Sequence, residues 1–261
     1  MSRLWPDSLL GVLSPRHIAL AKKPLLGRAT GAQFSRALEG DEDDHAQVLE
    51  AFEQGLATLS AGRSKLKLVL AGSLARYALT MPVTTLLSVE EESALARQTF
   101  VQRYGDASQS WTVRYQAQAL GDAFLASAVE NTLLEKLKTL CQTYKVELES
   151  VEPLLATAWR KSRRQLPRKA GWLAVTEPGR VHLLALHDRA WLSLASAHTH
   201  EDWEAVLATL LQREAAVLDR KGDETVWLMG AASGINLPAA RPWRWLTTPT
   251  GDTPYLDFVL G

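Results

Sequence analysis

Apolar runs and turn residues alternate most clearly between Gly171 and Thr199. Three short apolar runs, at 172–175, 181–186 and 191–195, are separated by two clusters of turn-forming residues, Glu177-Pro178-Gly179 and His187-Asp188-Arg189. Short strands bounded by Pro, Gly and Asp are typical of a β-meander. The segment therefore predicts three antiparallel strands joined by tight turns, with His182 and His187 at the surface of the meander.

After the meander the spacing of apolar residues changes from that of strands to that of a helix. A polar stretch from His198 to Asp202 precedes apolar positions at helical spacing that continue to about Leu218. A further strand is predicted at 225–229, and it ends in a glycine-rich turn from Gly230 to Gly234. We expect the tryptophans of this region to pack in its core; they are Trp172, Trp191, Trp203 and Trp227.

A second copy of the opening hairpin lies near the N-terminus. The segment Leu10–Ala21 (LGVLSPRHIALA) aligns with Leu173–Ala185 (LAVTEPGRVHLLA), which is one residue longer. Two copies of one supersecondary unit predict a duplicated, two-lobed fold. In both regions strands and helices are mixed, with crossovers long enough for parallel pairing, so the fold class is α/β.

The intervening chain follows the same mixture of periods. A helix is predicted after the acidic run 41–44 and ends near Ser60, whereas 27–40 is polar and reads as irregular. The predicted strands are 66–71, 76–81, 111–116, 123–129 and 146–151, and the predicted helices are 88–104, 131–144 and 152–162. Ser88 and Glu91 have capping-box spacing at the start of the second helix.

Charge and cysteine content exclude several classes of protein. Lys+Arg and Asp+Glu both number 29, and this balance argues against a broad electrostatic surface for nucleic acid or an anionic membrane. The basic cluster 160–169 is interpreted as a solvated linker between lobes. The single cysteine, Cys141, lies in an apolar helical run and is expected to be a buried small hydrophobe in a reducing compartment. No window of about 18 apolar residues predicts a membrane span, so we expect a cytoplasmic protein.

The order of elements between Leu66 and Trp159 resembles that of one family. The segments LVLAGS (68–73) and RYALTMP (76–82) are similar to a strand pair that ends in Pro in PilM, the actin-like cytoplasmic protein of type IV pilus assembly. The segments SVEEE (88–92) and WTVRY (111–115) and the strand that ends in Glu152-Pro153 continue the pattern. The cytoplasmic domain of the type II secretion protein GspL has a related build. In element order the resemblance extends from about Leu9 to Gly234.

This resemblance implies an actin-like α/β fold, in which duplicated ribonuclease H-like lobes contain mixed sheets flanked by helices. The first lobe is expected at 1–165, with an inserted α/β subdomain at about 73–150, and the second at 166–261. The implied function is that of an assembly scaffold, peripheral to the inner membrane, which binds the cytoplasmic segment of a PilN-like bitopic partner. Self-association is a further possibility. The residues expected to be exposed in a partner-binding groove are Arg76, Tyr77, Trp111, Arg114 and Tyr115.

The residues that a nucleotide site requires are incomplete. Actin-like kinases and ATPases use an acidic residue in the turn of each meander, and glycine-rich turns whose amides face phosphate. The first hairpin carries Leu13 at this position, and in the second Glu177 is followed by Pro178, which has no amide donor. The sequence therefore predicts a protein without catalytic residues or a cofactor. The alternative is an actin-like ATP-binding protein or phosphotransferase that holds ATP and Mg²⁺ through Glu177, Gly230 and Gly234.

Three weaker patterns remain. His198, His200 and Asp202 lie close together, but the local sequence supplies too few ligands for zinc, and we expect no metal site. The Trp243-Arg244-Trp245 segment alternates aromatic and cationic side chains, which fits either an edge strand of the second sheet or part of a contact surface. The apolar end of the chain, 253–261, is expected to dock onto its own sheet or another chain.

Overall fold

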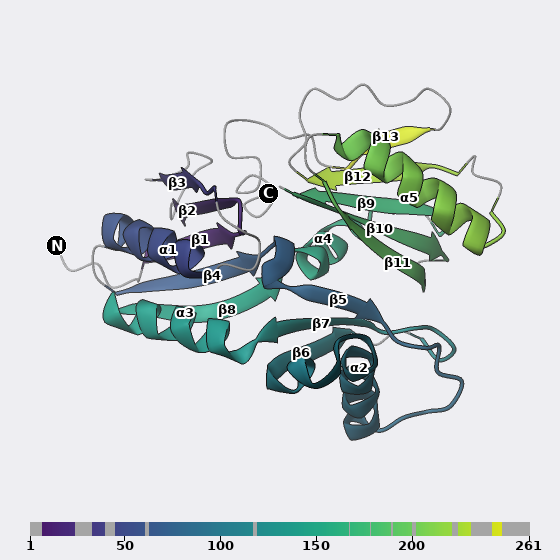
Figure 1. The fold of residues 1–261 in the computed structure, drawn as a ribbon, viewed down its shortest axis with the longest axis horizontal. Helices are drawn as coiled ribbons and strands as arrows, with labels where there is room; N and C mark the ends of the chain where they lie inside the picture. Colours follow the sequence, from purple (N-terminus) through teal and green to yellow (C-terminus); the bar gives the residue numbers. More distant parts are fainter. Residues whose placement is uncertain are drawn as a thin grey trace. The chain divides into compact units, whose positions relative to one another are not determined.

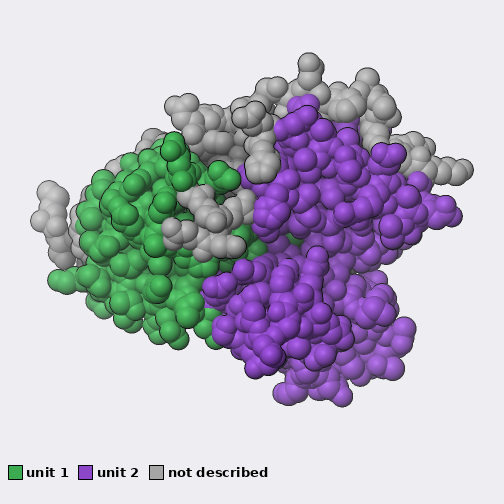
Figure 2. Space-filling view, viewed as in Figure 1, with its two compact units in different colours: residues 1–75, 131–157, 249–261 green, residues 76–130, 158–248 purple. Residues whose placement is uncertain are grey.

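The computed structural model describes residues 7–23, 33–39, 45–60, 63–116, 119–166, 168–177, 179–188, 190–199, 202–220, 224–230 and 242–246. The chain divides into two compact units (Figure 2). Unit 1 comprises residues 1–75, 131–157 and 249–261, and unit 2 comprises residues 76–130 and 158–248.

Unit 1 is built on a five-stranded mixed sheet. Its strands are β1 (Asp7–Leu13), β2 (His17–Lys23), β3 (Gln33–Ala37), β4 (Ser64–Leu70) and β8 (Val146–Pro153), in the order β3-β2-β1-β4-β8. The first three strands pair antiparallel, and β1, β4 and β8 pair parallel. The predicted N-terminal hairpin is therefore confirmed. The prediction that 27–40 is irregular was wrong for β3, because this strand is a mostly exposed edge strand without the apolar alternation of a buried one.

Among the described residues, two helices belong to this unit, and the chain passes from unit 1 to unit 2 within a third. Helix α1 (His45–Leu59), which the sequence predicts, buries Val48, Phe52 and Leu56 on one face, and α3 (Asn131–Thr143) buries Leu133, Leu137 and Cys141. The two helices lie side by side (Figure 1). Helix α4 (Leu154–Ser162) follows β8 directly, as the sequence predicts.

Unit 2 contains a second five-stranded sheet with the same pairing pattern. Its strands are β9 (Gly171–Glu177), β10 (Arg180–His187), β11 (Ala190–His198), β12 (Val226–Gly230) and β13 (Trp243–Trp245), in the order β11-β10-β9-β12-β13. The meander pairs antiparallel, and β9, β12 and β13 pair parallel. Because both sheets place a meander beside two parallel strands, the duplication predicted from the hairpin repeat is confirmed. The Trp243–Trp245 segment is the predicted edge strand.

One face of the second sheet packs against helix α5 (Trp203–Val217). Trp172, Val181, Leu183, Leu207 and Leu211 form the centre of this core, and Trp203 packs against it. Trp191 and Trp227 are also buried, so all four predicted core tryptophans contribute to packing.

Unit 2 also holds a small antiparallel sheet made from residues inside the segment that we expect to be an insert. Its strands are β5 (Arg76–Leu79), β6 (Trp111–Gln116) and β7 (Leu125–Glu130), in the order β5-β7-β6. Helix α2 (Val89–Tyr104) packs Ala96 and Phe100 onto one face of this sheet. The helix begins with the predicted capping box, in which Ser88 and Glu91 each bond the other's backbone. Short 3₁₀ turns occupy Gly72–Leu74 and Gly105–Ser110.

Candidate functional site

Glu177 is the acidic residue at the turn of the second hairpin, where the alternative nucleotide site would need one. Its side chain is enclosed within the meander of β9, β10 and β11. Its Oε1 lies 2.8 Å from Nε2 of His182, and Nδ1 of the same imidazole lies 2.7 Å from Oγ of Ser196. His182 is directly opposite Ser196 in the β10–β11 register, so the three side chains connect β9, β10 and β11. The Glu177 and His182 side chains are 0% and 1% exposed, respectively.

The prediction that His182 lies at the surface was wrong, whereas His187 is exposed as expected. Odd-numbered residues of β10 face α5, and His182 therefore points to the other face of the sheet. It can be buried there because Glu177 and Ser196 satisfy both ring nitrogens. Tyr77 packs edge-on against the imidazole at a centroid distance of 5.1 Å.

The environment of Glu177 fits a structural carboxylate better than a ligand of nucleotide-bound Mg²⁺. One oxygen is bonded to His182, and Oε2 is buried without a hydrogen-bond partner among the described residues. Mg²⁺ usually retains several of its waters, which a fully enclosed side chain cannot accommodate. Leu13, at the corresponding place in the first hairpin, is fully buried and has no ligand atom. Across the described ranges, no three His, Cys, Asp or Glu side chains are grouped so that they could hold a metal ion.

Gly230 has a structural reason to be glycine. It ends β12 with a φ of 127°, and a Cβ placed there would collide with the backbone carbonyl oxygen of Thr176 in the neighbouring β9. A left-handed backbone and a close strand approach both require the absence of a side chain. Gly234 lies outside the described residues, so the use of these two glycines by a nucleotide stays a prediction.

The residues weighed as zinc ligands make other contacts. Nε2 of His198 lies 3.1 Å from Nη2 of Arg180, and Oδ1 of Asp202 accepts a hydrogen bond of 2.9 Å from the backbone amide of Ala205. Asp202 is therefore the N-cap of α5. His200 lies outside the described residues.

Three of the five predicted partner-binding residues serve internal packing. The Arg76 guanidinium lies 4.4 Å from the centroid of the Trp111 ring and 3.1 Å from a carboxylate oxygen of Glu130. Trp111 and Tyr77 are both buried. The expectation that they are exposed was wrong, because Trp111 faces α2 and Tyr77 faces the His182 ring from the opposite side of the small sheet.

Arg114 and Tyr115 are the accessible members of the predicted set. Arg114 is exposed on the outer strand β6. The Tyr115 hydroxyl donates a 3.0 Å hydrogen bond to Oε2 of Glu92, and its ring stacks on Phe124 at 5.8 Å. Desolvation, this hydrogen bond and the negative charges of Glu92 and Glu90 raise the pKa of Tyr115. The tyrosine therefore remains a neutral hydrogen-bond donor that ties β6 to the start of α2.

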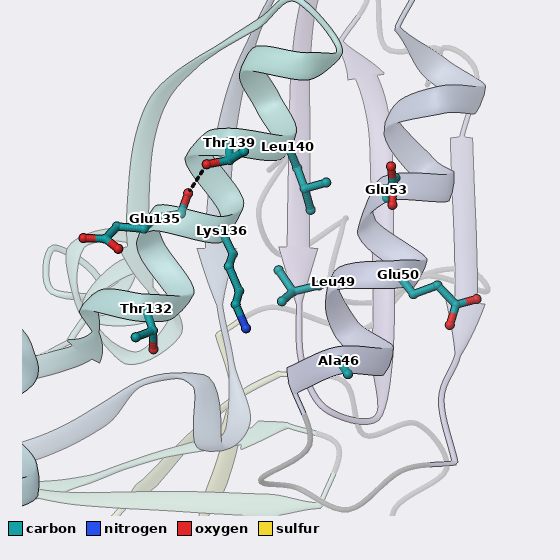
Figure 3. A pocket seen from close by; sticks show the side chains of 9 residues that line it. All are labelled: Ala46, Leu49, Glu50, Glu53, Thr132, Glu135, Lys136, Thr139 and Leu140. Atoms are coloured by element: carbon teal, nitrogen blue, oxygen red, sulfur yellow. Dashed lines mark hydrogen bonds between the residues drawn. The ribbon is translucent and has the colours of Figure 1, made fainter.

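Unit 1 has an open groove between α1 and α3 that the sequence analysis did not identify (Figure 3). Its volume is about 650 Å³, and Leu49 and Leu140 project into it from facing helices, with the Lys136 side chain extending from α3 beside them. Tyr144 donates a 3.2 Å hydrogen bond to Glu53 and so links the chain after α3 to α1. The groove was missed because it joins segments about ninety residues apart, and because its lining combines both charges with apolar groups.

Among the helices that the structure describes, none has both the length and the apolar character needed to cross a membrane.

The sequence matches no protein-family model and no curated protein. Solved structures do resemble the chain. The cytoplasmic domain of EpsL, an inner-membrane component of the type II secretion system of Vibrio cholerae, superimposes with a TM-score of 0.62 at 10% identity, over 97% of this chain and 94% of that one. The PilM–PilN type IV pilus biogenesis complex gives 0.59 at 12% identity, over 85% and 81%. A Bacteroides thetaiotaomicron protein with an actin-like ATPase fold gives 0.58 at 10% identity, over 87% and 83%.

These likenesses match the resemblance drawn from the residues, and the two sheets show the expected duplication. The chain therefore has the actin-like α/β fold, with mixed sheets flanked by helices, that is found in PilM and in the cytoplasmic domain of GspL-type proteins.

Proposed function

We propose that this protein is a non-catalytic scaffold in a cytoplasmic, inner-membrane assembly platform of the type IV pilus or type II secretion kind. It binds the cytoplasmic segment of a PilN-like bitopic membrane protein and meets the membrane only through that partner. The fold is similar to one component of each system, the EpsL cytoplasmic domain and PilM, and this likeness supports the proposal.

The enclosure of the Glu177 carboxylate is the main support for proposing that the protein is not a catalyst. A phosphotransferase of this architecture needs acidic groups open to a hydrated metal and to the attacking water. Here the acid of the second hairpin is 0% exposed and bonded to His182, and the first hairpin has the buried Leu13. At these two hairpin positions, both among the described residues, no carboxylate is open to a hydrated metal, and this supports the proposal.

The partner-binding part is assigned to the exposed end of β6. This strand is at the edge of the small sheet, and Arg114 and Tyr115 lie on it with partly or fully accessible side chains. An extended peptide can add to such an edge through backbone hydrogen bonds, while neighbouring side chains give specificity. Arg76 packs on the buried Trp111 at the start of β6 and so supports this edge from within the fold.

The test measures binding of labelled peptides by fluorescence anisotropy. The peptides are the cytoplasmic segments of the single-span inner-membrane proteins of the source organism. At least one should bind the wild type and lose affinity about tenfold in Arg114→Ala, a loss of about 1.4 kcal/mol. Lys138→Ala, at an exposed position of α3, is the matched control and should bind as the wild type does. Failure of every segment to bind would contradict the scaffold function.

Calorimetry with Mg-ATP tests the alternative of an ATP-binding protein or phosphotransferase. We expect neither binding nor hydrolysis at millimolar nucleotide. Micromolar binding or turnover that disappears in Glu177→Gln, a substitution that keeps a hydrogen-bond acceptor for His182, would overturn the non-catalytic function.

A further inference from the structure

An exposed apolar surface lies where the small sheet meets the start of α2. Leu86 and Leu120 are 87% and 59% exposed and lie together on this surface. Together with Val83, Leu87 and the buried Phe124 they line a hollow of about 70 Å³. We call these five residues the Leu86–Leu120 patch. Apolar surface concentrated around a hollow is typical of a protein-binding site.

Backbone hydrogen bonds hold the two halves of the patch together. The amide of Gly121 donates to the carbonyl of Val83 at 2.7 Å, and the amide of Thr80 donates to the carbonyl of Phe124 at 3.0 Å. The Thr80 hydroxyl in turn accepts from the Phe124 amide at 2.8 Å. These bonds extend the β5–β7 pairing beyond its last residues. The patch is therefore preorganised, which lowers the entropy lost when a partner binds.

The two chain segments that form the patch carry only negative charge. Residues 80–92 and 119–124 include Glu90, Glu91, Glu92 and Asp122 and contain no Lys or Arg, although acidic and basic residues are equal in number over the whole chain. Glu92 lines the hollow itself. The other carboxylates at the start of α2 also suit the helix dipole, but Asp122 is on a different segment, so the acidic character is not confined to one helix end.

We propose that the Leu86–Leu120 patch docks a cationic amphipathic segment, in which apolar residues fill the hollow and Lys or Arg side chains meet the acidic rim. The inference rests on the proposed function, because it identifies this segment as the membrane-proximal part of the bitopic partner. Cytoplasmic residues next to a membrane span are enriched in Lys and Arg, and this supplies the charge that the rim complements.

The same rim disfavours two other occupants. Anionic lipid headgroups on the cytoplasmic leaflet would be repelled by the carboxylates. A second copy of the patch would place like charges opposite one another, so self-association through this surface is also disfavoured.

The experiment uses two labelled peptides that differ in charge alone, one alternating leucine with lysine and the other leucine with glutamate. The full-length protein should bind the leucine–lysine peptide at least about tenfold more tightly, and added salt should weaken the binding. Leu120→Ser and Glu90→Lys should each reduce the affinity about tenfold. Val217→Ser on α5, where the side chain is 73% exposed, and Glu135→Lys on α3 are matched controls and should leave it unchanged.

Equal affinity of the wild type and the two patch variants would overturn the inference. So would binding of the protein to phosphatidylserine vesicles that is lost in Leu120→Ser, because the patch would then be a membrane-contact surface. The bitopic-protein segments are measured against the same variants. If no segment binds the wild type, the proposed function fails; if a segment binds the wild type and both patch variants alike, only the patch assignment fails.

Discussion

Nε2 of His182 lies 2.8 Å from Oε1 of Glu177, and both side chains are almost completely removed from solvent. The second ring nitrogen of His182 reaches Ser196, so one imidazole connects all three strands of the meander. A hydrogen bond in this setting is costly to break, because the partner left behind is buried and cannot be hydrated. The pair therefore gives Glu177, the residue that the alternative nucleotide site would use, a role in the stability of the sheet.

Glu177→Ala should lower the free energy of unfolding by about 2–3 kcal/mol, because it leaves a buried ring nitrogen without its partner. Glu177→Gln should cost less, since the amide oxygen still accepts from His182. Urea denaturation followed by circular dichroism measures both. Ser196→Ala is the control: this serine is exposed, water can replace its hydroxyl, and we expect a loss of about 0.5–1 kcal/mol. Equal losses for Glu177→Ala and Ser196→Ala would contradict the structural role of the carboxylate.

Gly230→Ala should also destabilise the protein, by about 2–3 kcal/mol, through backbone strain and the collision of the new methyl group with the Thr176 carbonyl. Gly105→Ala separates the two effects. Gly105 has a φ of 63° and a ψ of −147°, a backbone conformation that essentially only glycine adopts, but a Cβ there would meet no atom within 4 Å, so only the backbone strain remains. Thermal unfolding of both variants checks this difference. A Gly230→Ala protein as stable as Gly105→Ala would show that β12 can move away from β9 without cost.

Arg76→Ala should lower the free energy of unfolding by about 1–2 kcal/mol, and Arg76→Lys should recover only part of the loss. The guanidinium stacks on Trp111 and pairs with Glu130 at the same time, which a lysine ammonium cannot reproduce. Urea denaturation measures the effect, with the exposed Arg114→Ala as a control expected within about 0.5 kcal/mol of the wild type. The two arginines should thus separate, Arg76 affecting stability and Arg114 affecting partner binding. A large loss of stability in Arg114→Ala would contradict this division.

Local patterns predicted much of the fold because local physics determines those elements. The capping box at Ser88, the helix α1 and the hairpin pairing of the meander depend on residues close in sequence, and all were confirmed. The hairpin repeat predicted the duplication because each copy builds the same antiparallel pair. The exposed strand β3 was missed, since backbone pairing with β2 rather than side-chain burial places it in the sheet.

Side-chain burial proved harder to predict than the elements. His182 and Tyr77 contact each other although they are about a hundred residues apart in sequence, and neither burial can be inferred from its own strand. Residues 83–87 meet residues 119–124 in the Leu86–Leu120 patch through long-range pairing in the same way. Alternation along a strand shows that two faces exist, whereas contacts from distant segments decide which of them is covered.

The thiol of Cys141 should be unreactive in the native protein. Burial inside α3 raises its pKa to about 11, so at pH 8 the group is both enclosed and protonated. Reaction with a disulfide reagent should therefore be slow in buffer and fast in urea, because the thiolate is the nucleophile. Reaction at equal rates in buffer and urea would contradict the burial.

The raised pKa of Cys141 also makes the free energy of unfolding depend on pH. The folded-state pKa of Cys141 is above the ordinary thiol value of 9.0, so the unfolded chain loses its proton first as the pH rises. The contribution of the protonated thiol to the free energy of unfolding is fully present below pH 9.0 and declines between pH 9.0 and about 11. Tyr115 and Tyr144 also have raised pKa values, so the wild type must be compared with Cys141→Ala across this range. The difference in unfolding free energy between the two proteins should narrow as the pH increases, and a constant difference would show that the thiol titrates alike in both states.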